Sequence, residues 1–190
     1  LGFCRDCIKR GRLGIDNGQS ANKRKRRKIM LIRTASIEDI EKIAAVEAAC
    51  FPAAEAATKE QFSKRVEYYG NHFLLMFDGE QLVSFVDGFV TDEADLTDAM
   101  YEEAERHNEK GAWQMLFGVN TLPEYRRRGL AGALLQQMIQ EAEEQKRKGL
   151  VLTCKDSLVP YYAKFGFVNE GVSTQSTHGN VVWNQMRLSF

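Results

Sequence analysis

The sequence lacks three features that would each have pointed to a class of protein. No apolar run approaches the roughly 20 residues that a membrane-spanning helix needs. The N-terminal residues have no continuous apolar core of the kind a secretory signal contains, so we expect a cytoplasmic location and no membrane partner. No GxxxxGK[ST] or GxGxxG motif is present, which excludes the Walker loop and the dinucleotide-binding loop.

Cysteine and histidine are also scarce. The cysteines are Cys4, Cys7, Cys50 and Cys154, and the histidines are His72, His107 and His178. Cys4 and Cys7 form a CxxC pair, but neither a second CxxC nor a Cys/His pair at zinc spacing follows, so we expect no metal site. The other two cysteines stand in apolar surroundings, where they are expected to be small buried hydrophobes.

Positive and negative charges cancel over the whole chain but are unevenly placed. Residues 1–29 hold 10 Lys/Arg and 2 Asp/Glu, a net charge of +8, and the rest of the chain carries −8. We expect this basic segment, with 23-KRKRRK-28, to be a flexible, solvated tail. A nucleic-acid-binding arm and a non-native extension, with translation starting at Met30, are the alternatives. Residues 30–190 are expected to form one domain with its own core.

The apolar patterning after residue 28 predicts a mixed α/β fold. Strands are expected at 29–35, 72–77, 81–90, 112–121, 150–154, 166–175 and 180–189, the last two meeting at 178-HGN-180. Helices are expected at 36–49, 58–70, 129–149 and 156–164, and 92–110 is mostly helix-compatible. Ser36 with Asp39, and Thr58 with Gln61, resemble capping boxes. One strand–helix–strand crossover is centred on residue 129.

The segment 123-PEYRRRGLAGALL-135 has the composition of an anion-binding helix start. It directly follows a predicted strand and leads into apolar residues at helical spacing. A helix N-terminus offers unpaired N–H groups and a partial positive charge, which suit phosphates. Gly129 leaves room for a bulky diphosphate, and Arg126, Arg127 and Arg128 add positive charge. A surface helix with a basic start is the alternative interpretation.

Two motifs resemble those of the GCN5-related N-acetyltransferases. Arg126, Gly129 and Ala131 fit the [QR]-x-x-G-x-[GA] loop that holds the acetyl-CoA pyrophosphate in that family, and 161-YYAKFGF-167 fits its tyrosine-containing segment. The likeness covers about residues 30–190, and 152-LTCKDSLVPYYAKFGF-167 is similar to the arylalkylamine (serotonin) branch. It implies the family's fold, a mixed central sheet of about six to seven strands flanked by helices.

The resemblance also implies which residues bind acetyl-CoA as the co-substrate. In the family, main-chain N–H groups of the strand before the loop orient the thioester carbonyl, and these fall on Val119, Asn120 and Thr121. The pyrophosphate is expected on the loop itself, at Arg127, Arg128, Gly129, Leu130, Ala131 and Gly132. Phe51 and Pro52 lie where the family builds its acceptor pocket, although an aromatic residue there would also suit a core.

Acetyl transfer to an amine needs a neutral amine and a proton for the departing thiolate. Tyr162 matches the tyrosine that donates this proton in the serotonin-type enzymes; packing against the pantetheine is its alternative role. The two histidines of those enzymes are replaced by Met115 and Phe117, which cannot accept a proton. Asp87, a carboxylate inside an apolar run, is notable but is expected to be a strand-end or turn residue before Gly88.

The expected function is transfer of the acetyl group of acetyl-CoA to a primary amine, a small (aryl)alkylamine, by direct attack in a ternary complex. We expect no covalent acetyl carrier, because Cys154 has no base beside it. Acetylation of a protein or peptide amine is the second enzymatic hypothesis. A nucleic-acid-binding protein that keeps the fold as a CoA-binding module is a hypothesis of another class, and removal of residues 1–29 would distinguish it.

Overall fold

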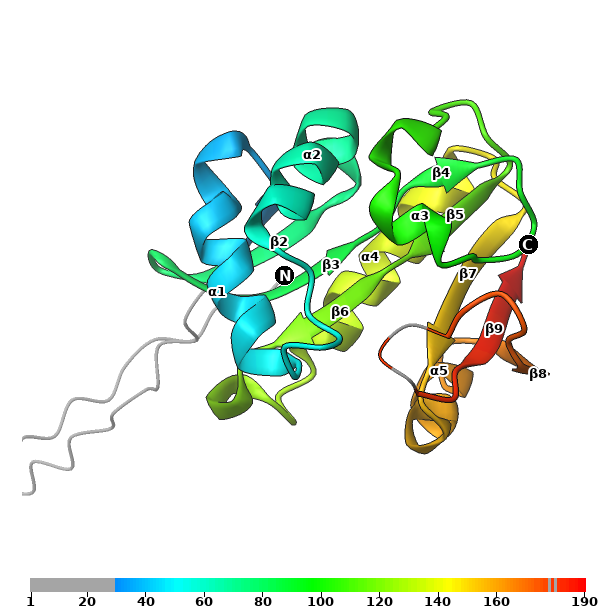
Figure 1. The fold of residues 1–190 in the computed structure, drawn as a ribbon. Helices are drawn as coiled ribbons and strands as arrows, with labels where there is room; N and C mark the ends of the chain where they lie inside the picture. Colours follow the sequence, from blue (N-terminus) through cyan, green and yellow to red (C-terminus); the bar gives the residue numbers. More distant parts are fainter. Residues whose placement is uncertain (1–29, 178, 180) are drawn as a thin grey trace, which may run out of the picture.

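Two adjoining sheets form the framework of the molecule (Figure 1). The structure, a computed structural model, describes residues 30–177, 179 and 181–190. Within this range nine strands form a four-stranded sheet of order β1-β2-β3-β6 and a five-stranded sheet of order β4-β5-β7-β9-β8. The basic segment 1–29 with its CxxC pair, and His178 in the last expected turn, lie outside the described residues, so the predictions about them stay predictions.

The first sheet is antiparallel and has helices on both faces. Its strands are β1 (Leu31–Thr34), β2 (Leu74–Asp78), β3 (Gln81–Asp87) and β6 (Gly118–Thr121). The covering helices are α1 (Ile40–Cys50) and α2 (Lys59–Tyr69) on one face and α4 (Leu130–Glu144) on the other. Because successive strand residues point to opposite faces, Leu75 and Phe77 pack under α1 and α2, whereas Leu74 and Met76 pack against α4.

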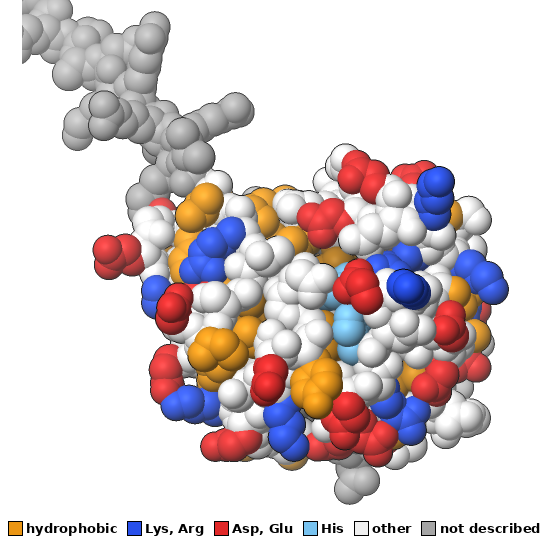
Figure 2. All heavy atoms as spheres, turned by 90° about the horizontal axis from the view of Figure 1, so that it is seen from above, with side chains coloured by type: hydrophobic (Ala, Val, Ile, Leu, Met, Phe, Trp, Pro, Cys, Tyr) orange, Lys and Arg blue, Asp and Glu red, His pale blue; other side chains and the backbone are white. Residues whose placement is uncertain are grey.

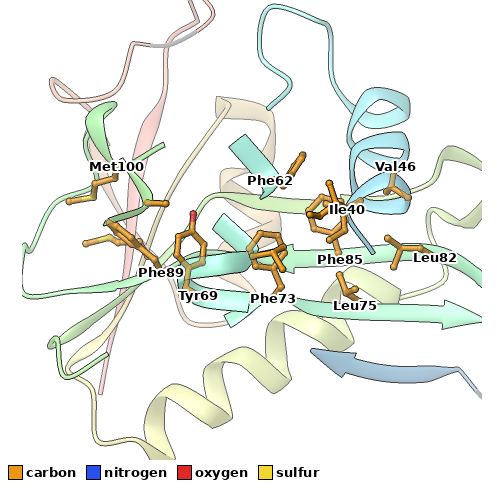
Figure 3. Packing of buried hydrophobic residues seen from close by; sticks show 14 of the residues in the cluster. Ile40, Val46, Phe62, Tyr69, Phe73, Leu75, Leu82, Phe85, Phe89 and Met100 are labelled. Atoms are coloured by element: carbon orange, nitrogen blue, oxygen red, sulfur yellow. The ribbon is translucent and has the colours of Figure 1, made fainter. Parts of the chain in front are cut away.

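Aromatic side chains dominate the core under α1 and α2. Phe62 meets Phe73 and Phe85 edge to face, and Tyr69 stacks on Phe73 at 5.8 Å between ring centroids (Figure 3). Each such buried ring contributes roughly 1.5–3 kcal/mol through removal from water. This packing fixes α2, which carries a charged residue of the site described below.

The second sheet contains the parallel crossover that the sequence predicted. Its strands are β4 (Val90–Thr91), β5 (Trp113–Leu116), β7 (Gly149–Cys154), β9 (Asn184–Ser189) and β8 (Val168–Val172). β5 and β7 pair in parallel and are joined through β6 and α4. α5 (Val159–Ala163) follows β7 and packs against β8 and β9.

Two predicted strands are each divided between the sheets. The run 81–90 becomes β3 and β4, and the run 112–121 becomes β5 and β6. The first half of each run pairs with the second half of the other, so β3 pairs with β6 and β4 pairs with β5. The expectation of one central sheet with six to seven strands is therefore corrected to two sheets, and the division lies at the site.

The acidic segment 92–110 forms much less helix than its composition suggested. It contains only α3 (Ala99–Glu102) and a single 3-10 turn over Ala104–Arg106. Tertiary hydrogen bonds hold its backbone instead, because Asp98 N–H donates to the Gln175 carbonyl and Asn108 N–H to the Val90 carbonyl. Among the described residues, no helix combines the length and the apolar character that crossing a membrane would take.

Candidate active site

The two sheets separate at a bulge in the chain between β5 and β6. The N–H of Phe117 donates to the Asp87 carbonyl, while the next residue, Gly118, is paired with the same Asp87 in the β3–β6 register. Two residues facing one partner make a bulge, which bends a strand and turns it away from its neighbour. β5 stays beside β7, and β6 leaves it, so a space opens between β6 and β7.

The bend leaves main-chain donors of β6 facing that space. Leu122 N–H donates to the Val83 carbonyl, so the alternation of an antiparallel ladder places Asn120 in a hydrogen-bonded pair with Phe85. The N–H groups of Val119 and Thr121 therefore point the other way, towards β7. Of the three donors expected here, Val119 and Thr121 have the required direction, whereas the N–H of Asn120 faces β3.

The start of α4 has the backbone shape expected of a phosphate loop. Gly129 immediately precedes the helix at φ +81°, in the left-handed region that favours glycine, and a side chain there would point into open space. The arginines before it are exposed, and two of them donate to main-chain carbonyls, one at the end of β6 and one in the loop. Arg126 Nε donates to Thr121 at 3.1 Å, and Arg128 Nη2 donates to Glu124 at 2.6 Å.

The tyrosine-containing segment packs directly on this helix start. A Cβ at Gly132 would lie 3.1 Å from the Phe165 ring and 3.7 Å from the Tyr161 hydroxyl oxygen. Tyr161 and Phe165 also meet edge to face at 5.3 Å. The two motifs that the sequence singled out, about thirty residues apart, thus pack against each other.

A pocket of about 190 Å³ lies where β6 and β7 diverge. Its aromatic walls are Phe51, Tyr101, Phe117, Tyr162 and Trp183. Four carboxyl groups line the pocket but only one guanidinium does. The carboxyl groups are those of Glu47, Glu55, Asp87 and Glu102, and the guanidinium is that of Arg65. A pocket with apolar walls and few convergent polar groups is a typical small-molecule site, and this one has an acidic balance.

The most buried charged side chains of the pocket are Glu47, Arg65 and Asp87, which are 6%, 5% and 1% exposed. Burial raises the pKa of Asp87 to about 7, although Arg65 opposes the shift. Burial likewise raises the pKa of Glu47, whose carboxylate accepts hydrogen bonds from the Ala57 N–H and the Asn120 side-chain amide. Asp87 does end a strand as expected, but its side chain also faces the pocket.

Tyr162 reaches the pocket from α5. It is 7% exposed, and its ring meets Tyr161 at 5.2 Å and Phe167 at 6.1 Å, both edge to face. Burial raises the pKa of its phenol, so the hydroxyl stays protonated throughout the physiological range. It can therefore donate a proton but cannot act as a base at neutral pH.

A comparison with known proteins agrees with this arrangement. The model of the family described as "Acetyltransferase (GNAT) domain" matches residues 38–190. The chain belongs to the GNAT acetyltransferase family. As a GNAT domain it is an acyl-CoA-dependent N-acyltransferase, and the mixed α/β fold expected from the sequence is confirmed.

Solved structures share the fold of this GNAT domain at low sequence identity. The loading GNATL domain of CurA from Lyngbya majuscula is 16% identical with a TM-score of 0.74, over 85% of this chain and 98% of that one. PaiA N-acetyltransferase from Thermoplasma acidophilum, in complex with coenzyme A, is 16% identical with a TM-score of 0.63, over 85% and 99%. The ribosomal-protein-S18-alanine N-acetyltransferase from Escherichia coli is 18% identical with a TM-score of 0.62, over 85% and 94%. These comparisons support the family and do not support the arylalkylamine branch.

The remaining predicted residues of the GNAT domain lie in the pocket, in the core or at the surface. Phe51 lines the pocket, but Pro52 is exposed outside it, and its carbonyl closes the turn to Glu55 and Ala56. Met115 is fully buried under the helices, and Phe117 lies in the pocket wall. Sequence reasoning did not identify Arg65 or Glu47, because charged residues on amphipathic helices normally face solvent.

Among the described residues, one group of three side chains has ligand atoms close enough together to hold a metal ion. Its members are His72, His107 and Glu109. Figure 2 shows imidazole atoms at the surface beside acidic and basic side chains. The Nδ1 of His107 accepts the Val90 N–H, so its Nε2 carries the proton and faces Glu109 at 3.3 Å. The same carboxylate accepts from His72 at 2.9 Å, and Arg147 lies 3.2 Å from it. These bonds satisfy the group as a hydrogen-bonded cluster and disfavour a cation.

Proposed function

We propose that this protein transfers the acetyl group of acetyl-CoA to a small primary amine, an (aryl)alkylamine, by direct attack within a ternary complex. The observation that carries the proposal is the coincidence of three features at one place. Val119, whose N–H is turned away from β3 as that of Thr121 is, lines the acidic pocket, and α4, which begins after the left-handed Gly129, packs on β6 and β7.

Each feature supports one part of the reaction. The helix start and the exposed arginines suit the diphosphate of acetyl-CoA. The N–H groups of Val119 and Thr121 suit the thioester carbonyl, which gains negative charge as the amine attacks. Tyr162 suits protonation of the departing thiolate, because it lies in the same pocket and stays protonated.

The pocket supports the acceptor class. Its volume of about 190 Å³ suits a small molecule, its carboxyl groups attract an ammonium ion, and its aromatic walls can contact an alkyl or aryl group. A protein or peptide amine remains the second hypothesis. The E. coli neighbour is named for such a substrate, but at 18% identity it carries the fold alone.

The placement of acetyl-CoA is tested by Gly129→Glu, with Gly79→Glu as a matched control. Both glycines have positive φ, +81° and +63°, and at both a side chain would enter open space, but Gly79 lies in the β2–β3 hairpin. We expect Gly129→Glu to weaken acetyl-CoA binding by about tenfold or more, since it adds bulk and negative charge against the diphosphate. Calorimetry should show no such loss for Gly79→Glu, and equal affinities in the two variants would refute the placement.

A further inference from the structure

Asp87 is a buried carboxylate without a tight ion pair. The Nη1 of Arg65 lies 3.4 Å from its Oδ2, at the outer limit of a hydrogen bond, while Nη2 of the same arginine donates at 2.8 Å to the Tyr101 carbonyl. The structural pair Arg33–Asp39 is different, because both guanidinium nitrogens donate to the two carboxylate oxygens at 2.6 Å. The main-chain N–H of Gly118 is a further hydrogen-bond partner of this carboxyl group, which therefore has partners but no close ion pair.

The carboxyl group of Asp87 also lies beside the bulge. A Cβ at Gly118 would collide with Asp87 Oδ1, so the carboxylate occupies the space that a side chain at the bulge would fill. Gly118 adjoins Val119, whose N–H faces the proposed thioester carbonyl. An amine in the pocket that attacks this carbonyl would meet Asp87 close to the reacting atoms.

The surrounding groups set the charge of this carboxyl. Arg65 on α2 is the cation that faces it, Glu47 on α1 is the nearby anion, and Tyr69 on α2 has a buried hydroxyl. Arg65 itself is held between the Phe62 and Phe117 rings, with its Cζ 5.4 Å from each ring centre. Burial outweighs Arg65 and brings the pKa of Asp87 to about 7, near the pH at which a base works best.

We propose that Asp87 is the proton acceptor for the substrate, and that the substrate is a small primary alkylammonium ion. This inference rests on the proposed function. The ammonium ion gives one proton to the Asp87 carboxylate, leaving a neutral amine and a carboxylic acid. The amine nitrogen then bonds to the thioester carbon and the carbon–sulfur bond breaks. The departing thiolate takes the hydroxyl proton of Tyr162, and the second proton of the nitrogen passes to the Tyr162 phenolate and restores its hydroxyl. Asp87 afterwards releases its proton to water.

The test uses Asp87→Asn, with Glu105→Gln, an exposed carboxylate outside the pocket, as control, and two amines of similar shape. Benzylamine is charged at neutral pH and needs a base, whereas aniline is already neutral. We expect Asp87→Asn to lower kcat/KM for benzylamine by about 10²–10⁴-fold. The kcat/KM for aniline should change little. Acetyl-CoA affinity, measured by calorimetry, should be unchanged in both variants. With benzylamine, the wild-type rate should level off above about pH 7, and the rate of Asp87→Asn should keep rising with pH.

Other outcomes would overturn the inference in distinguishable ways. Equal losses with both amines in a variant that still binds acetyl-CoA would make Asp87 structural. Full benzylamine activity in Asp87→Asn would remove it from the reaction. A wild type that binds acetyl-CoA and acetylates peptides but no small alkylamine would refute the substrate class. Failure of the wild type to bind acetyl-CoA would refute the proposed function itself.

Discussion

Burial decides the chemistry of the single residues around the pocket. Burial raises the pKa of Cys154 to about 11, so its thiol is un-ionised at neutral pH and a poor nucleophile. This agrees with direct attack by the amine rather than transfer through an acetyl-cysteine. The neighbouring Tyr162 is also held protonated by burial, which for a proton donor is the useful state.

The role of Tyr162 can be separated from its packing by Tyr162→Phe. The substitution removes the hydroxyl and keeps the ring contacts with Tyr161 and Phe167, so acetyl-CoA affinity should be nearly preserved. Turnover should fall by about 10²–10⁴-fold, the usual effect of losing a general acid. Steady-state kinetics measure this loss. The control is Tyr161→Phe, at a residue whose ring packs on α4, and it should change turnover little. Full activity of Tyr162→Phe would take the residue out of the mechanism.

At the scale of elements, the entry into α1 shows local and non-local forces acting together. The capping box expected at Ser36 is present, because Asp39 Oδ2 accepts the Ser36 N–H at 2.9 Å. Arg33 of β1 binds the same carboxylate, which joins the helix entry to the sheet edge. The hydrogen bonds from Arg33 lower the pKa of Asp39 to about 2, against the opposing effect of burial.

We expect Asp39→Ala to lower the free energy of unfolding by about 1 kcal/mol or more at neutral pH, as the loss of a helix cap does. The folded-state pKa is depressed from 3.8 to about 2, so this stabilisation is present above pH 3.8 and is lost as the pH falls towards 2. Urea unfolding at several pH values should show the two proteins converging over that window. Glu38→Ala, which removes an exposed neighbouring carboxylate, is the control; an equal effect there would argue against the cap.

At the scale of the whole molecule, the site exists because two sheets share a divided pair of strands. The helices on the first sheet bring Glu47 and Arg65 to the pocket, and the second sheet brings Cys154 and, through α5, Tyr162. The family match begins at residue 38 and the first strand at Leu31, so every element of the site lies after the basic segment 1–29.

We therefore expect a chain that begins at Met30 to fold and to bind acetyl-CoA as the full chain does. The basic segment has too few apolar residues for burial to offset the entropy of ordering it. Thermal unfolding and calorimetry on both chains test this, and a clearly lower melting temperature of the shorter chain would contradict it. Any affinity of the full chain for nucleic acid should disappear with the segment.

The sequence alone determined the features that depend on near neighbours. The order of elements follows from periodicity, the capping boxes at Ser36 and Thr58 from residues three apart, and the loop before α4 from the need for glycine at a left-handed position. These interactions form within one or two turns of chain, so composition and spacing are enough to predict them.

Only the tertiary structure decided where the strands divide and which charges meet. The bulge at Phe117 and Gly118 depends on β3, which comes thirty residues earlier, and Asp87 meets Arg65 only because α2 packs across that sheet. The segment 92–110 is held by distant strands rather than by its own helical bonds. Such pairings are set by burial and by backbone partners far away in the chain, and a carboxylate in an apolar run looks the same in sequence whether it ends a strand or faces a substrate.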